Sequence, residues 1–248
     1  MRKLKLKIIL CLYNWVGCEV LEHVLQRGDI EEIAIFTHEV TPSAMADPST
    51  IAVQKGIWMS TESINDVRLP FNPDIIASVY YRQVIKKHVI EAADGKVFNM
   101  HPSLLPRHRG CSSIPWAIID GDSFTGVTFH YIDQGIDTGR VLLQAAIPIT
   151  PSDTQESLYQ RCMRTGAQYW PAAFELVKCN FHGVEQYGEP SFHKRGAPNN
   201  GVIDDNWPLD KIERFIRAMT YPPYPYATYE GISIRTLDEY LDLSRGSR

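Results

Sequence analysis

The sequence contains neither a glycine-rich GxGxxG fingerprint nor a GxSxG motif. The first marks the loop that holds the pyrophosphate in many dinucleotide-binding folds, and the second marks the nucleophilic serine of α/β-hydrolases. Where a GxGxxG loop would follow the first apolar run, the chain has YNWVG. The sequence therefore gives little support to a dinucleotide-dependent enzyme or a serine hydrolase.

Paired cysteines are also missing. The five cysteines are an odd number and none forms a CxxC pair, so neither a disulfide framework nor a cysteine-based zinc site is indicated. Buried free thiols in a reducing compartment are the better interpretation, and a cytoplasmic protein is therefore expected.

Positive charge is not in excess, because the formal net charge is −4 at pH 7. Binding to nucleic acid depends largely on a positive field around the protein, and this chain has none overall. We therefore expect no nucleic acid among its partners.

No run of apolar residues reaches the roughly 20 that a membrane-spanning helix needs, so no membrane partner is expected. Residues 2–12, RKLKLKIILCL, have the basic start and apolar run of a signal peptide. However, Asn14 ends the run early and no A-x-A cleavage site follows. A first core strand is the better interpretation.

Continuous apolar runs predict buried strands over Leu6–Leu12, Ile30–Phe36 and Asp74–Val79. Between the first two, we expect a loop over residues 13–17 and then an amphipathic helix that ends at Gly28. This order is typical of a βαβ unit, so the predicted fold class is α/β with a mostly parallel sheet and flanking helices.

The middle of the chain continues this alternation of strands and helices. Residues 80–93 have apolar side chains at helical spacing, and residues 97–100 form another short buried strand. Residues 126–132 alternate like a strand, with residues 139–149 as the expected hairpin partner. A capping box at residues 152–155 would then open a long helix.

Polar residues follow the predicted strand over residues 97–100. Asn99 and His101 lie two positions apart, so their side chains point to the same side of an extended chain. Open α/β folds bind ligands at the carboxyl edge of the sheet. An amide and an imidazole at this strand end therefore predict a functional site, and Asp137 in a later glycine-bounded turn could complete it.

The stretch FNMHPSLLPRHRG, followed by GVTFHYIDQGIDTGRVLLQ, resembles the signature of the 10-formyltetrahydrofolate-dependent formyltransferases. The resemblance implies that Asn99, His101 and Asp137 are the catalytic residues, and their separations of 2 and 36 residues fit the family pattern. It also implies a Rossmann-like catalytic core over residues 1–180. Residues 181–248 would then form a small helical or irregular extension that shapes the acceptor site.

Formyl transfer is the attack of an amine on an amide-like carbonyl, which creates an oxyanion and a positive nitrogen. Asn99 can donate an N–H bond to the oxyanion. His101 can donate a second bond or act as the general base, and Asp137 can fix the imidazole tautomer or accept the proton through a water. The sequence leaves open which of these two residues is the base.

A resident metal is not expected. His101, His108 and His130 are possible zinc ligands by residue type, but their spacings match no usual ligand pattern and no cysteine pair assists them.

The resemblance implies 10-formyltetrahydrofolate as co-substrate, with its pterin hydrogen-bonded to the backbone of two loops. The predicted folate-binding residues are Gln83, Val84, Ile85, Asp133, Gln134, Gly135 and Ile136.

The C-terminal region, which contains RFIRAM and a following proline–aromatic stretch, resembles that of sugar N-formyltransferases. This implies a nucleotide-linked dideoxy-amino sugar as the acceptor, as in O-antigen biosynthesis. Binding of the nucleotide would need aromatic side chains for the base and cations for the pyrophosphate. The alternative is that the aromatic and basic side chains of this region only pack within it or face solvent. The predicted acceptor-binding residues are Lys194, Arg195, Trp207, Arg217 and Tyr221.

Other functions on the same fold stay open at this point. They are formylation of glycinamide ribonucleotide or another amine, hydrolysis of the folate to formate, and folate binding without catalysis. Many relatives are dimers, so the resemblance also suggests a homodimer.

Overall fold

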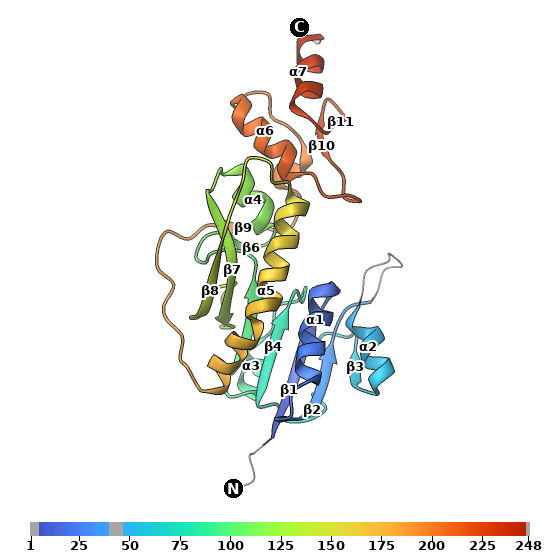
Figure 1. Cartoon of the computed structure of the whole chain (residues 1–248), viewed down its shortest axis with the longest axis vertical. Helices are drawn as coiled ribbons and strands as arrows, with labels where there is room; N and C mark the ends of the chain where they lie inside the picture. The colour runs from blue at the N-terminus through green and yellow to red at the C-terminus, as the bar shows by residue number, and fades with distance from the viewer. Residues whose placement is uncertain (1–4, 40–46, 247–248) are drawn as a thin grey trace. The chain divides into compact units, whose positions relative to one another are not determined.

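The computed structural model describes residues 5–39 and 47–246, so most of the predicted turn-rich loop over residues 40–50 lies outside the described residues. Within these residues the chain forms a seven-stranded sheet, in the order β3-β2-β1-β4-β5-β7-β8 (Figure 1). Its strands are β1 (Leu6–Leu12), β2 (Ile30–Phe36), β3 (Trp58–Ser60), β4 (Ile75–Val79), β5 (Val97–His101), β7 (Phe124–Tyr131) and β8 (Val141–Pro148).

The strands from β3 to β5 all run parallel, and β7 pairs antiparallel with β5. Helices make three of the four connections between consecutive parallel strands, as is usual for βαβ crossovers, and only residues 61–74, between β3 and β4, lack one. The prediction of an α/β fold with a mostly parallel sheet is therefore confirmed. The helices associated with this sheet are α1 (Asn14–Leu25), α2 (Pro48–Lys55), α3 (Lys87–Ala92) and α5 (Gln155–Lys178).

The chain folds into two compact units that are interleaved along the sequence, with a boundary inside β7, β8 and α5. Unit 1 comprises Met1–His101, Thr128–Gln144 and Arg164–Tyr187. Unit 2 comprises Pro102–Val127, Ala145–Met163 and Gly188–Arg248. The predicted division at residue 180 concerns which residues perform the reaction, and it stays a prediction.

Side chains alternate between the two faces of the sheet in unit 1. On one face, Ile9 and its neighbours form a core cluster with Val89 of α3. On the other face, the Trp170 ring of α5 lies 5.8 Å from the His23 ring of α1 and 6.1 Å from the Phe98 ring of β5, between centroids. Asn99 has the opposite parity to Phe98, so it lies on the α3 side.

Unit 2 contains shorter elements, and two of its helices, α4 (Ser113–Ile119) and α6 (Leu209–Ala218), pack against each other. Helix α6 buries Ile212, Phe215 and Ile216, and Met219 at its C-cap is buried as well. The elements of this unit are β6 (Arg109–Gly110), α4 (Ser113–Ile119), β9 (Phe192–His193), the 3-10 helix η1 (Pro198–Gly201), α6 (Leu209–Ala218), β10 (Ala227–Tyr229), β11 (Ile232–Ile234) and α7 (Leu237–Gly246).

Helix α1 begins earlier than predicted. The expected loop over residues 13–17 is wrong, because the helix starts at Asn14. A Cβ on Gly17 would lie 3.0 Å from both Leu12 Cβ and Pro48 Cγ. The glycine therefore permits close packing of the helix and does not mark a loop.

The helix predicted over residues 80–93 is wrong in its first half, because α3 covers Lys87–Ala92. The Asn65 side chain donates to Val84 O at 2.9 Å and accepts from Lys86 N at 2.8 Å. These bonds satisfy backbone groups that a helix would otherwise pair with each other. A distant side chain thus overrides the local apolar spacing.

The cap of helix α5 also differs from the prediction by two residues. Thr154 Oγ1 accepts from Ser157 N at 3.2 Å, and Thr154 N donates to Ser157 Oγ at 3.1 Å. This is the reciprocal pattern of a capping box, with serine in place of the usual acidic or amide residue. The box predicted at residues 152–155 is therefore displaced to residues 154–157.

Two further predictions concern the cysteines and membrane-spanning helices. Cys11, Cys18 and Cys162 are buried free thiols, as expected, whereas Cys179 is exposed. None of the helices within residues 5–39 and 47–246 is long and apolar enough to cross a membrane.

Candidate active site

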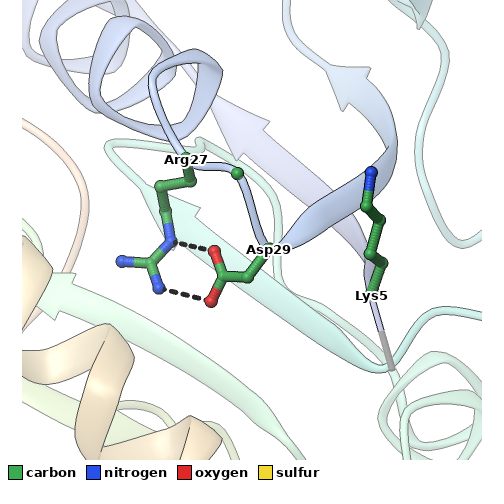
Figure 2. Close-up of a pocket in the computed structure, with 4 residues that line it drawn as sticks. Lys5, Arg27 and Asp29 are labelled. Atoms are coloured by element: carbon green, nitrogen blue, oxygen red, sulfur yellow. Dashed lines mark hydrogen bonds and ion pairs between the residues drawn. The ribbon is translucent and has the colours of Figure 1, made fainter. Parts of the chain in front are cut away.

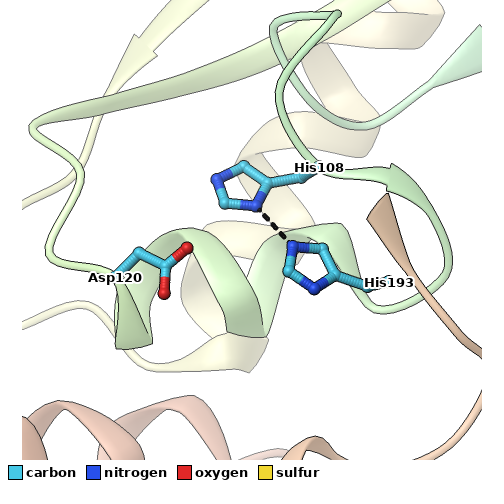
Figure 3. Close-up of side chains that lie close together, drawn as sticks. All are labelled: His108, Asp120 and His193. Carbon is cyan, nitrogen blue, oxygen red and sulfur yellow. Dashed lines mark hydrogen bonds between the residues drawn. The ribbon is translucent and has the colours of Figure 1, made fainter. Parts of the chain in front are cut away.

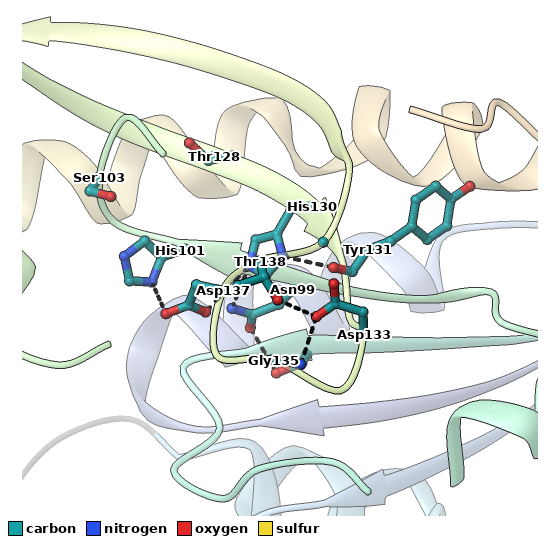
Figure 4. A network of polar contacts seen from close by, with 12 residues as sticks. Asn99, His101, Ser103, Thr128, His130, Tyr131, Asp133, Gly135, Asp137 and Thr138 are labelled. Carbon is teal, nitrogen blue, oxygen red and sulfur yellow. Dashed lines mark hydrogen bonds and ion pairs between the residues drawn. The ribbon is translucent and has the colours of Figure 1, made fainter. Parts of the chain in front are cut away.

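A row of polar side chains crosses three strands at the carboxyl edge of the parallel strands. The register pairs Ser78 of β4 with Asn99 of β5, and Asn99 with His130 of β7. Directly paired residues project to the same face of a sheet. The strand register therefore brings Ser78, Asn99 and His130 side by side, although they are distant in sequence. Figure 4 shows Asn99 and His130.

The carboxamide of Asn99 is held from both sides. Ser78 Oγ donates to Asn99 Oδ1 at 2.8 Å, and Asn99 Nδ2 lies 3.3 Å from His130 Nε2. Because His130 Nδ1 lies 2.8 Å from the carbonyl oxygen of Tyr131, it must carry the proton in that bond. His130 Nε2 then accepts from Asn99 Nδ2, which uses one of the two amide hydrogens.

His101 and Asp137 meet at the end of β5. His101 Nδ1 lies 3.4 Å from Asp137 Oδ2, and His130 Nε2 lies 3.5 Å from Asp137 Oδ1. Both histidines are nearly fully buried, and the Asp137 side chain is 14% exposed. The structure thus brings Asn99, His101 and Asp137 together, with His130 between the amide and the carboxylate (Figure 4).

The turn that carries Asp137 is shaped by bonds within residues 133–139. Asp133 Oδ1 accepts from Gly135 N at 3.0 Å and from Thr138 Oγ1 at 2.5 Å. Gly139 approaches the preceding strand so closely that a Cβ there would lie 1.8 Å from Tyr131 O. Glycine is therefore required where the turn rejoins β8, and the turn places the carboxylate at the end of β5.

The side chain of Gln186, which lies outside this turn in the sequence, forms hydrogen bonds to the backbone of the turn. Its Nε2 donates to Asp137 O at 2.8 Å and to Gly139 O at 2.9 Å. The residue comes from the segment after α5, and no sequence pattern near it indicates a role. The predicted folate-binding residues of this turn are mostly exposed, including Asp133, Gln134, Gly135 and Ile136.

The second predicted folate-binding loop follows β4. The Gln83 side chain accepts from Tyr81 Oη at 3.2 Å, and the Val84 carbonyl accepts from Asn65. The Val84 side chain is 63% exposed, whereas Ile85 is buried in the α3 cluster. Asn65 and the α3 cluster therefore hold the backbone of this loop and the Ile85 side chain from within unit 1, whereas the Val84 side chain is exposed.

The predicted acceptor-binding residues form two groups in unit 2. Lys194 and Arg195 are exposed and directly follow β9. Trp207, Arg217 and Tyr221 lie on or beside α6.

The second group is engaged in contacts within unit 2. Trp207 packs edge-on against Phe215, with ring centroids 5.1 Å apart. Arg217 donates to Glu213 at 2.6 Å and to Asp153 O at 2.7 Å. Tyr221 packs against Tyr159, with ring centroids 5.2 Å apart.

Three residues that shape the site were not predicted from the sequence: Ser78, Gln186 and Asn65. His130 was expected as a polar neighbour on the strand that leads into the Asp137 turn, and the structure adds its bond to Asn99. The other three depend on contacts that only the folded chain reveals.

A cavity of about 470 Å³ lies at the other end of the sheet, lined by Lys5, Arg27, Gly28 and Asp29 (Figure 2). Lys5 precedes β1 and Asp29 precedes β2, so both lie at the amino ends of parallel strands. Asn99 and His101 lie at the carboxyl end of β5. The cavity is therefore not part of the candidate active site.

Thiol nucleophiles are not indicated either. Burial raises the pKa of Cys162 to about 12, and burial, together with nearby acidic groups, raises the pKa of Cys18 to about 12. Thiols with such pKa values stay protonated at neutral pH and are poor nucleophiles. The chemistry available at β5 is hydrogen bonding and proton transfer by Asn99, His101 and Asp137.

Comparison with known proteins identifies the family. A family model described as formyl transferase matches residues 14–174. A GDP-perosamine N-formyltransferase of Brucella melitensis is 34% identical over 227 residues, which cover 88% of this chain and 87% of the relative.

Two solved structures share the fold. WlaRD, a sugar 3N-formyl transferase solved in the presence of dTDP and 5-N-formyl-THF, has a TM-score of 0.80 at 24% identity, over 93% of this chain and 85% of that one. An N-formyltransferase from Helicobacter canadensis, in complex with folinic acid and dTDP-3-aminofucose, has a TM-score of 0.77 at 22% identity, over 93% and 87% of the two chains. The family model and the Brucella relative, with this fold, establish that the chain belongs to the formyl transferase family.

Proposed function

We propose that the protein transfers the formyl group of 10-formyltetrahydrofolate to the amino group of a nucleotide-linked amino sugar, for cell-surface polysaccharides such as O-antigen. The observation that carries this proposal is the meeting of Asn99, His101 and Asp137 at the carboxyl edge of the sheet, with His101 Nδ1 3.4 Å from Asp137 Oδ2. Residues 1–180 would perform the reaction, and residues 181–248 would shape the acceptor site.

Asn99 is assigned to the oxyanion that forms when the amine attacks the formyl carbon. Its Nδ2 donates one hydrogen to His130, and its second hydrogen would bond to the developing negative oxygen. Ser78 keeps the amide oxygen turned away, because its hydroxyl donates to Oδ1. The amide therefore presents its donor end without reorganisation during the reaction.

His101 and Asp137 are assigned to the proton that the attacking amine must lose. Asp137 Oδ2 faces Nδ1 of His101, so the imidazole would direct Nε2 toward the reacting atoms. The imidazole would take the proton directly, or the carboxylate would take it through a water. The proton finally reaches the N10 nitrogen of the tetrahydrofolate that leaves, so the reaction consumes no net acid or base.

The folate would bind to the loops over residues 83–85 and 133–137. Asn65 holds the first loop and Gln186 holds the second, which supports recognition of the pterin by backbone groups kept in fixed positions. The relatives solved with formyl-THF and folinic acid further support this co-substrate. No metal is needed for this chemistry.

The acceptor would be a GDP-linked amino sugar of the perosamine type. This choice rests on the name of the 34% identical Brucella relatives. Lys194 and Arg195 are exposed cations that would bind the diphosphate. Trp207 and Tyr221 would offer aromatic surface to the base, and Arg217 would bind the ligand only by exchanging its present bonds with Glu213 and Asp153.

Purified protein, 10-formyltetrahydrofolate and a panel of amino-sugar nucleotides test this function. Tetrahydrofolate should be released only when an acceptor is present, and fastest with GDP-perosamine. Release of tetrahydrofolate without any acceptor would indicate a hydrolase, and release with glycinamide ribonucleotide would indicate a glycinamide ribonucleotide formyltransferase. No release at all would indicate a folate-binding module. Each of these three results would overturn the proposal.

The acceptor contacts need a separate test. Alanine at Lys194, Arg195 and Arg217 together should raise the KM for the acceptor and leave the KM for the folate unchanged. Alanine at the exposed Lys55, Arg68 and Lys87 is the matched control for lost positive charge.

We further propose a cytoplasmic homodimer, and sedimentation of the full chain should give the mass of two copies.

A further inference from the structure

Two histidines and an aspartate come together in unit 2, apart from the residues assigned to formyl transfer. One nitrogen of His108, one nitrogen of His193 and a carboxylate oxygen of Asp120 all lie within 4.8 Å of one another (Figure 3). His108 Nδ1 and His193 Nε2 are 3.0 Å apart. Sequence spacing did not indicate this set, because His193 follows His108 by 85 residues.

Backbone pairing holds the two histidines in place. Strands β6 and β9 run parallel, with Gly110 paired with His193. His108 N donates to Ser191 Oγ at 2.8 Å, and His108 has a φ of +56°, in the left-handed region that few non-glycine residues adopt. Non-glycine residues in this region persist where the surrounding structure fixes them, often at functional sites.

A second carboxylate fixes the tautomer of His108. His108 Nε2 donates to Asp122 Oδ2 at 2.7 Å, and Arg107 donates to the other oxygen at 2.6 Å. With the proton on Nε2, the lone pair of His108 is on Nδ1, toward His193.

The position of the His193 ring is fixed by aromatic stacking. The ring stacks on Trp116, with centroids 4.5 Å apart and an interplanar angle of 9°. The His193 ring also lies 5.2 Å from the His108 ring between centroids, so contacts with two rings fix the orientation of this imidazole.

We propose that His108 Nδ1, His193 Nε2 and the Asp120 carboxylate bind a divalent transition-metal ion of the zinc class. Two imidazoles and a carboxylate are a common protein donor set for Zn²⁺. The Asp122–His108 bond supplies the carboxylate that typically orients a metal-binding histidine through its other nitrogen. Water would complete the coordination.

The observed spacing is close to what such an ion needs. Nitrogens bound tetrahedrally at about 2.0–2.1 Å from Zn²⁺ lie roughly 3.3 Å apart. The imidazoles would therefore move by a few tenths of an ångström, and the exposed Asp120 side chain would rotate inward. The proton now shared between the rings would move to Nδ1 of His193 through solvent, so binding needs no net loss of a proton.

The ion would be structural. It would join the loop before β6, the C-terminal end of α4 and strand β9, all within unit 2. None of its ligands is assigned to formyl transfer, so this site does not depend on the proposed function.

Calorimetry with Zn²⁺ and visible absorption with Co²⁺ test the site on the full chain after treatment with a chelator. We expect one equivalent of either ion to bind, Co²⁺ to develop the strong visible absorption of four-coordinate sites, and the melting temperature to rise with Zn²⁺. The metal content of the purified protein, measured by mass spectrometry, is an independent readout.

Variants then identify the ligands. His193→Gln and Asp120→Asn should each weaken Zn²⁺ binding at least tenfold, and Asp122→Asn about 10- to 100-fold. His182→Gln removes an exposed histidine outside the cluster and should change nothing. Circular dichroism checks that each variant is folded. No stoichiometric binding, or binding unchanged in His193→Gln, would show only a hydrogen-bonded histidine pair and overturn the proposal.

Discussion

Nδ2 of Asn99 lies 3.3 Å from Nε2 of His130, and this bond turns the donor end of the amide away from Ser78. The direction of the bond follows from the Tyr131 carbonyl, which requires the His130 proton on Nδ1. His130 therefore positions Asn99 without needing to touch the substrate itself.

Replacing His130 by Phe should lower kcat about 10- to 100-fold and leave the folate KM unchanged. The amide would lose the acceptor that orients it, a loss of about 1–3 kcal/mol. His130→Gln should recover part of kcat, because its amide oxygen can accept the same bond. Gln144→Ala, which removes a bond to Thr128 on the same strand, is the control. Wild-type kcat in His130→Phe would refute the positioning role.

Asp137→Asn should lower kcat by roughly 100- to 10,000-fold, because the imidazole of His101 loses the carboxylate that holds its tautomer. Steady-state kinetics with acceptor and folate varied separately would measure this. Thr138→Ala removes the bond to Asp133 Oδ1 that shapes the same turn but keeps the Asp137 carboxylate, so it should lower kcat by less than about tenfold. Equal losses in both variants would mean that the turn, and not the carboxylate, is responsible.

Gln186→Ala should raise the KM for 10-formyltetrahydrofolate more than it lowers kcat. The variant removes two bonds to the turn, to Asp137 O and Gly139 O, each worth roughly 0.5–1.5 kcal/mol. Fluorescence titration with folinic acid would report the affinity independently of turnover. An unchanged affinity would show that the turn keeps its shape without Gln186.

Strand positions were predictable wherever burial on both faces left a continuous apolar run. Leu6–Leu12 and Ile30–Phe36 begin and end at the expected residues. The sequence also predicted that the side chains of Asn99 and His101 lie on the same side of the strand, because side chains two residues apart in a strand project to one face. Such properties depend on neighbouring residues alone.

Properties that depend on register or on distant partners were not predictable. The role of His130 requires β7 to lie beside β5 with Asn99 opposite it. The Asn65 side chain, 19 residues earlier in the chain, donates a hydrogen bond to the Val84 carbonyl, which would otherwise accept a bond within a helix. Arg217 was predicted to contact the acceptor, and no sequence pattern indicated that it bonds to Asp153 O, 64 residues earlier in the chain. Local patterns carry no information on such contacts.

Acid stability should depend on Asp29, which lies between two cations at the amino edge of the sheet. It accepts two bonds from Arg27, at 3.0 and 2.8 Å, and pairs with Lys178 of α5. The bond from Arg27, with that from Lys178, holds the pKa of Asp29 well below its usual range, although burial opposes this.

A carboxyl whose pKa is lower in the folded state stabilises the fold above its unfolded pKa of about 3.9, and this contribution is lost as the pH falls through the folded value. Asp29→Asn should therefore lower the free energy of unfolding by about 1 kcal/mol at pH 7, since the Asp29 side chain is 22% exposed and solvent screens the pair. Well below pH 4 the difference should shrink toward zero. Urea unfolding between pH 3 and 7 would measure it, with the exposed Asp94→Asn as control. A difference that stays constant over this range would contradict the assigned charge interaction, because it would not follow the ionisation of Asp29.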